Sequence, residues 1–365
     1  MKFGGTSVRD DESRSAALIH IQQNVDDGNK VVVVVSAMGR KGDPYATDTL
    51  IQLLKDVGEP ISPIELDLVM SCGEILSAAY FSHLMNQHQL PGIAFTGAQA
   101  GILTDDNAGE ADILDINPKR IQNALDEGKI PVVTGFQGAN SDGDVRTLGR
   151  GGSDTSAVTL GAALNAEKVE IYSDVNGIAN ADPRQINEAE FLSKISVQHI
   201  LTMAKEGSKV IHPLAVKASL KTQTPIVAKN TFNNSEGTII YHGDSEENTV
   251  CIAHRENLVL IETEEKVDFS EIQDIIKANE TQYLLEDNVY LEEKIEMLKH
   301  INQHFNISKN WASISVIIGH VKSEAIEIPD AILNDSDKKI IRYFLKNKNL
   351  TESIGTLFRH YIKNN

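Results

Sequence analysis

Cysteine is scarce in this sequence, and long apolar runs are missing from it. The 365 residues include two cysteines, Cys72 and Cys251, which lie far apart. Two distant cysteines exclude a disulfide scaffold and fit a reducing compartment. We expect Cys72 to be a small buried side chain, as free cysteines often are. The longest purely aliphatic run, residues 31–35, is far shorter than a membrane span, and no signal-peptide core follows Met1. We therefore expect a cytoplasmic protein without a membrane partner.

Positive charge is also in short supply. The 34 Lys and Arg residues are outnumbered by 52 Asp and Glu residues, which gives a formal net charge of −18. Nucleic acids and anionic membranes need a basic surface, so we expect neither as a partner. A nucleotide needs only a local cluster of cations and stays possible. The length exceeds that of one ordinary core, so two domains are expected.

Glycine, in contrast, is concentrated in two similar segments about 145 residues apart. Residues 2–7 read KFGGTS, and residues 149–154 read GRGGSD. Adjacent glycines let backbone N–H groups approach phosphate oxygens, while the neighbouring Lys2 or Arg150 supplies positive charge. One such loop is weak evidence, but two predict an anion site that both loops form together.

Residues 1–242 alternate strand-like and helix-like segments. The strand-like segments are β-branched and apolar: residues 31–35, 130–135, 169–173, 224–228 and 238–241. The helical stretches between them are residues 11–25, 64–84 and 153–166. This pattern predicts an α/β fold with an open, mostly parallel sheet covered by helices. Ligands bind such sheets at the carboxyl ends of the strands, where both glycine segments fall.

After residue 242 the composition changes. Glycine pairs disappear, and Glu, Lys, Asn and Ile dominate. We predict a small α+β domain over residues 243–365. Its expected elements are strands at 258–263 and 313–319, helices at 269–278, 340–345 and 357–362, and an apolar helical stripe of Leu291, Ile295, Leu298 and Phe305.

The polar residues of these loops suit phosphoryl transfer. Lys2, Arg150, Lys209 and Arg184 supply positive charge, and Asp154 and Asp174 are oxygen ligands suited to Mg²⁺. No Ser–His–Asp or Cys–His signature is apparent. Phosphoryl transfer needs positioning and charge neutralisation, with little covalent chemistry from the protein.

Eight segments, in one order and spacing, resemble aspartate kinase, a member of the amino acid kinase superfamily. They are KFGGTSV (2–8), VSAMG (35–39), SCGE (71–74), TGAQAG (96–101), GFQG (135–138), GRGGSD (149–154), SDVNGIANADPR (173–184) and GSKVIHP (207–213). The lysine-pathway enzymes of Gram-positive bacteria look most similar. The resemblance covers about residues 1–240 and implies the amino acid kinase fold there, followed by an ACT-like regulatory or dimerisation domain.

The resemblance also implies a reaction and its ligands. ATP and Mg²⁺ would phosphorylate the side-chain carboxylate of L-aspartate, the entry step to lysine, threonine and methionine biosynthesis. The amino acid would bind to Ser36, Thr47, Glu74, Arg150 and Ser153. ATP would bind to Gly4, Gly5, Ser173, Asp174, Arg184 and Lys209. Lys2 would neutralise the transferred phosphoryl group, and Asp154 would organise Lys2 or Mg²⁺.

Two departures from the family pattern leave alternatives open. Family members carry a short apolar strand before KFGGTS, so we expect that strand to be missing and Lys2 to lie near a mobile terminus. The region after residue 242 looks shortened, which leaves feedback by lysine or threonine open, although a homodimer is expected. One alternative is a catalytically impaired homologue that binds ligand or acts through assembly. Another is a related kinase with a different acid substrate.

Overall fold

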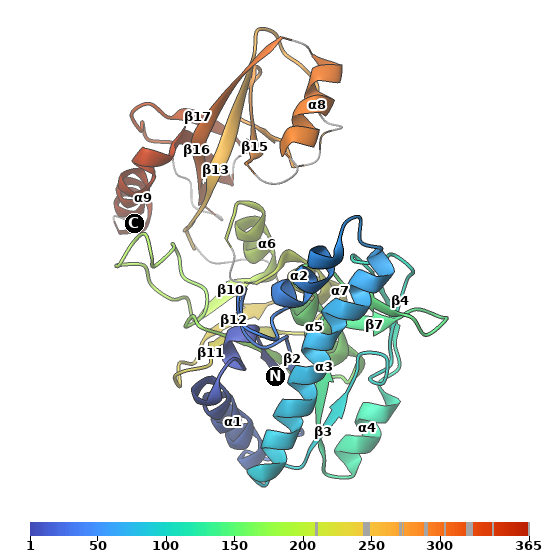
Figure 1. Cartoon of the computed structure of the whole chain (residues 1–365). Helices are drawn as coiled ribbons and strands as arrows, with labels where there is room; N and C mark the ends of the chain where they lie inside the picture. The colour runs from blue at the N-terminus through green and yellow to red at the C-terminus, as the bar shows by residue number, and fades with distance from the viewer. Residues whose placement is uncertain are drawn as a thin grey trace. The chain divides into compact units, whose positions relative to one another are not determined.

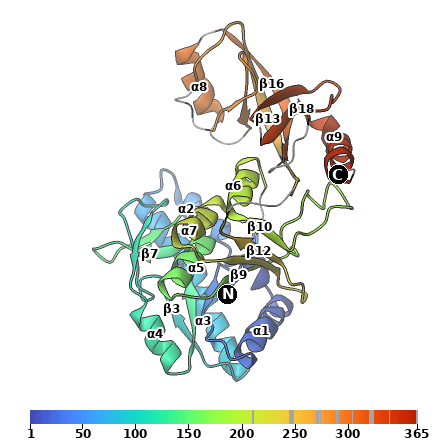
Figure 2. The same cartoon turned by 180° about the vertical axis from the view of Figure 1, so that it is seen from behind.

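The computed structural model describes most of the chain, which divides into two compact units (Figures 1 and 2). The described residues are 1–208, 211–243, 249–269, 272, 274–287, 291–302, 304–318, 324–337 and 339–363. The first unit comprises Met1–Ile178, Phe191–Val197 and Val210–Gly243, and the second Ala179–Glu190, Gln198–Lys209 and Asp244–Asn365. That the domains are residues 1–242 and 243–365 stays a prediction. In the structure, two segments before residue 243, residues 179–190 and 198–209, pack with the second unit.

An eight-stranded sheet forms the centre of the first unit, in the order β10-β12-β11-β9-β1-β2-β6-β3. Its strands are β1 Lys2–Phe3, β2 Val33–Val35, β3 Gly92–Phe95, β6 Ile130–Thr134, β9 Val169–Ser173, β10 Lys194–Ser196, β11 Ile226–Asn230 and β12 Thr238–Tyr241. All neighbours run parallel except β11 and β12. The open, mostly parallel sheet expected from the sequence is therefore confirmed.

A two-residue strand at the start of KFGGTS, β1, lies inside the sheet, which corrects the expectation that Lys2 lies near a mobile terminus. Lys2 pairs with Val34 of β2 on one side and with Ile171 of β9 on the other. Both residues of β1 are buried, with Lys2 9% exposed. Pairing on both edges gives the backbone of this short strand its hydrogen bonds, so Lys2 does not lie at a loose end.

Helices cover both faces of this sheet. Figure 1 shows α1 (Asp11–Asp26) and α3 (Pro63–Gln87) in front of the strands, and Figure 2 shows α5 (Gly152–Ala163) and α7 (Pro213–Thr222) on the opposite side. Asp10 begins α1, since its carboxylate accepts a hydrogen bond from the Ser13 N–H at 2.9 Å. The core between α1, α3 and the sheet includes Phe3, Ile21, Val33, Val35, Phe81, Met85 and Val132.

A second, four-stranded sheet of the first unit has the order β5-β4-β7-β8. Its strands are β4 Ile102–Thr104, β5 Ile113–Ile116, β7 Gln137–Ala139 and β8 Val145–Thr147. Two further helices are α2 Thr47–Val57 and α4 Lys119–Asp126. β8 runs directly into the segment GRGGSD, so this small sheet holds one side of the predicted site.

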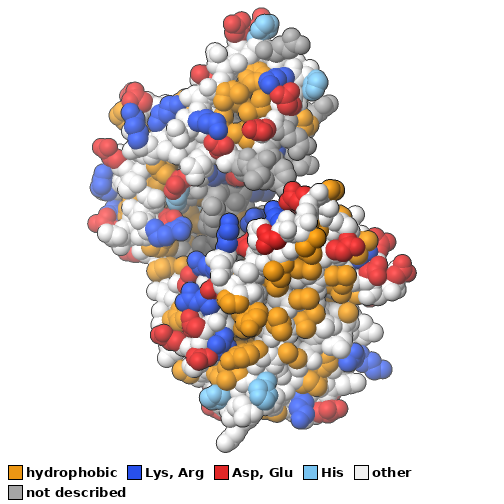
Figure 3. Space-filling view, in the orientation of Figure 1, with side chains coloured by type: hydrophobic (Ala, Val, Ile, Leu, Met, Phe, Trp, Pro, Cys, Tyr) orange, Lys and Arg blue, Asp and Glu red, His pale blue; other side chains and the backbone are white. Residues whose placement is uncertain are grey.

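The outer surface of α2 and α3 is apolar, as the orange side chains over these helices in Figure 3 show. Exposed members are Leu53, Val57, Ile64, Leu68, Ile75, Leu76 and Tyr80. Cys72 is exposed on α3, so the expectation that it is buried is wrong. In the described part of the chain, α3 alone is long and apolar enough to cross a membrane, yet half of its most apolar stretch is buried inside the protein. Half-burial is typical of a core helix.

The second unit contains a six-stranded antiparallel sheet with the order β14-β15-β13-β16-β18-β17. Its strands are β13 Cys251–Thr263, β14 Ile276–Lys277, β15 Gln282–Glu286, β16 Phe305–Ile317, β17 Ile332–Asp337 and β18 Ile340–Lys346. Its helices are α6 Val197–Lys205, which starts at the boundary with the first unit, α8 Leu291–Ile301 and α9 Leu350–Phe358. This is an α+β unit, as the composition predicts.

Two helices predicted in this unit are wrong. Residues 340–345 form β18, because Ile341, Tyr343 and Leu345 face the same core on alternate positions while the strand pairs with β16. Within residues 269–278 the described positions form turns and the short strand β14. The stripe that starts at Leu291 is confirmed as α8, although Phe305 belongs to β16.

Candidate active site

The two glycine-rich segments meet at the carboxyl ends of the central strands. A 3-10 turn, Gly5–Ser7, follows β1, and α5 starts inside GRGGSD. The Lys2 ammonium lies 2.6 Å from Oδ1 of Asp154, which sits in the first turn of α5. Both side chains are more than four-fifths buried. The start of α5 and the Lys2 side chain therefore meet at one corner, where Asp154 balances the Lys2 charge and the amino-terminal end of α5 suits an anion.

Gly5 allows the first loop to pack tightly on the turn after β2. A Cβ atom at Gly5 would lie 2.6 Å from the Gly39 carbonyl oxygen and 2.7 Å from that of Ala37. The Gly39 N–H donates a hydrogen bond to the Gly5 carbonyl at 3.0 Å. No side chain fits there, so KFGGTS and VSAMG are held together as one wall of the site.

Glu74 supplies a buried carboxylate beside that wall. It lies on α3, is 3% exposed, and accepts a hydrogen bond from the Ala37 N–H through Oε1 at 3.0 Å. Oε2 is buried and has no hydrogen-bond partner among the residues that the structure describes. Burial raises the pKa of Glu74 from 4.5 to about 7, against the opposing effects of the Ala37 N–H and the Lys2 charge. An unpartnered buried carboxylate oxygen is suited to receive a cationic group.

The other residues predicted to bind the amino acid lie on the same unit. Ser36 follows β2 and donates its N–H to the Phe3 carbonyl at 3.1 Å, and Thr47 is the first residue of α2. Ser153 is buried in the first turn of α5. Arg150 is exposed between two glycines of positive φ, and within the described residues no hydrogen bond or ion pair involves its guanidinium. Arg150 is thus a cation available to a ligand.

The residues predicted to bind ATP are divided. Gly4 and Gly5 lie beside Lys2, and Ser173 ends β9. Asp174 follows it and forms an ion pair with Arg40 at 2.9 Å, both side chains being exposed. Arg184 belongs to the second unit, where its guanidinium binds Asp182 at 2.7 Å. Lys209 lies outside the described residues.

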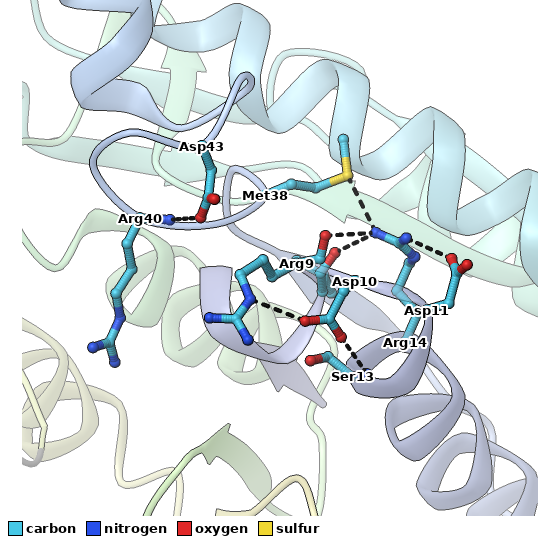
Figure 4. A network of polar contacts seen from close by, with 9 residues as sticks. Arg9, Asp10, Asp11, Ser13, Arg14, Met38, Arg40 and Asp43 are labelled. Carbon is cyan, nitrogen blue, oxygen red and sulfur yellow. Dashed lines mark hydrogen bonds and ion pairs between the residues drawn. The ribbon is translucent and has the colours of Figure 1, made fainter.

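Arg14 is a supporting residue that the sequence reasoning missed. Arg14 is buried, and Figure 4 shows its guanidinium beside Asp11 and Met38. It donates hydrogen bonds to the Val8 carbonyl at 2.8 Å and to the Arg9 carbonyl at 3.0 Å. Val8 ends the KFGGTSV segment and Arg9 follows it, so Arg14 fixes the chain where it leaves the loop that carries Lys2. The only local signal is its place in the first turn of a helix directly after that motif.

A Mg²⁺ ion fits this site only together with a nucleotide. Among the described residues, no three His, Cys, Asp or Glu side chains are grouped closely enough to hold a metal. Asp154 and Asp174 each already face one cation, Lys2 and Arg40 respectively. Mg²⁺ in nucleotide sites takes one or two carboxylates and fills its remaining positions with phosphate oxygens and water, which suits this donor set.

A separate cavity of about 300 Å³ lies at the amino-terminal ends of β1, β2 and β9. Met1, Lys168, Glu170 and Leu160 are among its lining residues. The Met1 ammonium donates to the Val32 carbonyl at 2.7 Å, and burial lowers its pKa to about 6. This cavity is at the opposite end of the strands from the glycine loops, so it is not the predicted site.

The mostly parallel sheet carries two glycine-rich loops and a buried carboxylate at the carboxyl ends of its strands. The chain belongs to the amino acid kinase family, whose sequence model matches residues 1–230. Over 239 residues it is 48% identical to aspartokinase 1 of Bacillus subtilis (strain 168), a match covering 66% of this chain and 59% of that protein. The match thus spans less than two thirds of this curated relative.

Solved structures resemble the chain over a longer stretch. Aspartokinase III of E. coli in complex with aspartate and ADP covers 99% of this chain and 98% of its own, with a TM-score of 0.78 at 19% identity. The same enzyme in complex with lysine and aspartate gives a TM-score of 0.72 at 18% identity. At this identity the similarity shows a shared fold, and it extends through the second unit.

Proposed function

We propose that this protein transfers the γ-phosphoryl group of ATP to the side-chain carboxylate of L-aspartate, giving 4-phospho-L-aspartate. The observation that carries the proposal is the 2.6 Å contact between Lys2 and Asp154, which brings the two glycine loops together beside the buried carboxylate of Glu74. Its support is the 48% identity to a bacterial aspartokinase.

The amino acid would be held at both of its α-substituents. Oε2 of Glu74, buried without a partner among the described residues, would accept the α-ammonium group. Arg150, which is free of ion pairs in the described part, would bind the α-carboxylate through two parallel hydrogen bonds. Ser36, Thr47 and Ser153 would line the remainder of the pocket. This arrangement selects an α-amino acid and directs its side chain toward Lys2.

Lys2 would neutralise the transferred phosphoryl group, with the N–H groups of Gly4 and Gly5 beside it. The acceptor carboxylate has an ordinary pKa near ~4, so it is already a nucleophile at neutral pH and needs no general base. Asp154 would therefore orient Lys2 through their contact and not abstract a proton. Ser173 and Asp174 are proposed for the nucleotide.

Mg²⁺ would enter with ATP and reduce the repulsion between the phosphate oxygens and the incoming carboxylate. Asp154 or Asp174 would hold it, directly or through water. The role of these carboxylates toward the nucleotide stays part of the proposal.

For the second unit we propose an ACT-like role in homodimer formation and in feedback by an end-product amino acid, lysine or threonine. The structure of aspartokinase III of E. coli with lysine motivates this assignment. A cytoplasmic location is proposed with it, in keeping with the two free cysteines. Light scattering at working concentration tests the dimer, and a monomer would contradict it.

The test of the main proposal is turnover. Purified protein is incubated with ATP, MgCl₂, aspartate and hydroxylamine, which traps an acyl phosphate as its hydroxamate. Arg150→Ala should raise the KM for aspartate and lower kcat, while Arg120→Ala, on the exposed side of α4, serves as a matched control. A panel of other acids under the same conditions decides the substrate.

Each outcome separates the alternatives. Hydroxamate formation with aspartate supports the proposal and eliminates the impaired homologue. Formation only with another acid supports a related kinase. Aspartate or ATP binding in calorimetry, without any hydroxamate above background, leaves the impaired homologue.

A further inference from the structure

Asp67 is a fully buried carboxylate on α3 that no sequence motif singled out. It is 0% exposed. Its two oxygens accept the Gly109 N–H at 3.0 and 3.1 Å, and Oδ1 also accepts the Thr147 hydroxyl. Burying a carboxylate costs free energy unless donors compensate it, and the Gly109 N–H and the Thr147 hydroxyl are such donors here. They tie α3 to two segments that are 42 and 80 residues away in sequence.

Both of these segments lead to Arg150. Thr147 is the last residue of β8, three positions before Arg150. The Ala111 N–H donates to the Thr147 carbonyl at 2.9 Å, and a Cβ atom at Gly149 would lie 3.3 Å from the Gly109 carbonyl oxygen. The turn that Asp67 holds therefore packs directly against the chain that carries Arg150.

The same face of α3 also holds the opposite wall of the site. Asp67, Ser71 and Glu74 are spaced four and three residues apart and are all buried, so they form one row along the helix. Seven residues of α-helix rise about 10 Å, and this rise is rigid. At one end of the row Asp67 binds the segment before Arg150, and at the other Glu74 binds Ala37 at 3.0 Å.

We propose that Asp67 is a positioning residue that sets the place of Arg150 relative to Glu74. The inference rests on the proposed function, in which these two residues bind the α-carboxylate and the α-ammonium of one amino acid. Those two groups are attached to a single carbon atom, so their separation is fixed. A displaced Arg150 would lose its bidentate contact while Glu74 kept its own, and misplacements near 1 Å cost up to about 10²-fold in rate.

Asp67→Asn is the first test, because it keeps the shape and removes the charge. The KM for aspartate should rise about tenfold or more, which corresponds to the loss of about 1.4 kcal/mol of binding, while the KM for ATP changes less than about twofold. If Asp67 had a purely structural role, the substitution would reduce the amount of active protein and lower kcat. It would not raise the KM for aspartate selectively over the KM for ATP. Asp126→Asn, at an exposed ion pair with Lys30, is the matched control and should leave both KM values unchanged.

The second test asks whether Asp67 acts through Arg150. In an Arg150→Ala background, Asp67→Asn should add little further to the KM for aspartate, since the group it positions is absent. Thr147→Val should reproduce the direction of Asp67→Asn, and Thr147→Ser, which keeps the hydroxyl, should restore most of the affinity. If Asp67→Asn fails to fold, the comparison of Thr147→Val with Thr147→Ser tests the proposal in its place.

Three results would overturn the inference: equal rises in both KM values, full additivity with Arg150→Ala, or Thr147→Val and Thr147→Ser behaving alike. Calorimetric aspartate binding is measured on the same proteins. An active wild type with an unchanged KM in Asp67→Asn overturns this inference alone. A wild type that neither binds nor phosphorylates aspartate overturns it together with the proposed function.

Discussion

Because the pKa of Glu74 is raised in the folded protein, the free energy of unfolding of the first unit should decrease as the pH rises. The isosteric substitution Glu74→Gln can measure this dependence. In the unfolded chain this carboxyl has its ordinary pKa of 4.5, and burial raises the value to about 7 in the folded protein. A group with the higher pKa in the folded state stabilises that state fully below pH 4.5, and this contribution is lost as the pH rises through about 7. Glu74→Gln mimics the protonated carboxyl at every pH, because the amide oxygen can still accept the Ala37 N–H.

The magnitude follows from the two pKa values. One pKa unit corresponds to about 1.4 kcal/mol, so the full effect of ionising Glu74 in the folded protein is about 3 kcal/mol. Between pH 5 and pH 8 the free energy of unfolding of Glu74→Gln should therefore gain about 2.5 kcal/mol relative to wild type, with most of the change below pH 7. Saturating aspartate should reduce this gain, because its ammonium group would partner the ionised Glu74.

Urea unfolding followed by far-ultraviolet circular dichroism at pH 5, 6, 7 and 8 measures this difference. Glu127→Gln, an exposed change at the end of α4, is the control and should give a difference that is flat with pH. A Glu74→Gln difference that varies by less than about 0.5 kcal/mol over this range would refute the reasoning, since it would mean that burial does not hold the proton on Glu74.

Three further changes test other parts of the structure. Lys2→Met should lower kcat by about 10²-fold or more, because a donor aimed at the transferred group is lost; a kcat within threefold of wild type in the hydroxamate assay would contradict that role. Gly5→Ala should destabilise the protein by about 1–3 kcal/mol, since its Cβ would lie 2.6 Å from a backbone oxygen, whereas Gly4→Ala, whose nearest contact would be 3.6 Å, should cost less in thermal unfolding. Glu206→Gln should cost about 2–3 kcal/mol in urea unfolding, because it weakens the largely buried pair with Arg342 at 2.7 Å; a loss under 0.5 kcal/mol would show that the pair is solvated.

The sequence predicts the sheet and the meeting of the glycine loops because both have strong local signals. The apolar β-branched runs at β2, β6 and β9 are buried strands, and the loops fall where parallel strands end. The same local reasoning missed β1 as a strand. Two residues carry no periodicity, and their structure comes from the pairing partners on both sides.

Residues whose role depends on distant partners could not be found in this way. Asp67 is one acidic residue in a long helix, and its partners are 42 and 80 residues away. Residues 340–345 read equally well as a helix or a strand, because a short apolar run has no distinguishing period. Pairing with β16 decides between the two, and that pairing is not visible in the segment itself.

The path of the chain between its two units limits how it can be cut. Residues 179–190 and 198–209 pack with the C-terminal unit, whereas the stretch between them and the strands β11 and β12 return to the N-terminal one. A shortened protein that ends after residue 243 would leave residues 179–190 and 198–209 without their packing partners. Glu206, for example, would lose its ion pair with Arg342. To obtain the first unit alone for crystallisation or drug screening, these two segments would have to be redesigned. A stop codon after residue 243 would not be enough.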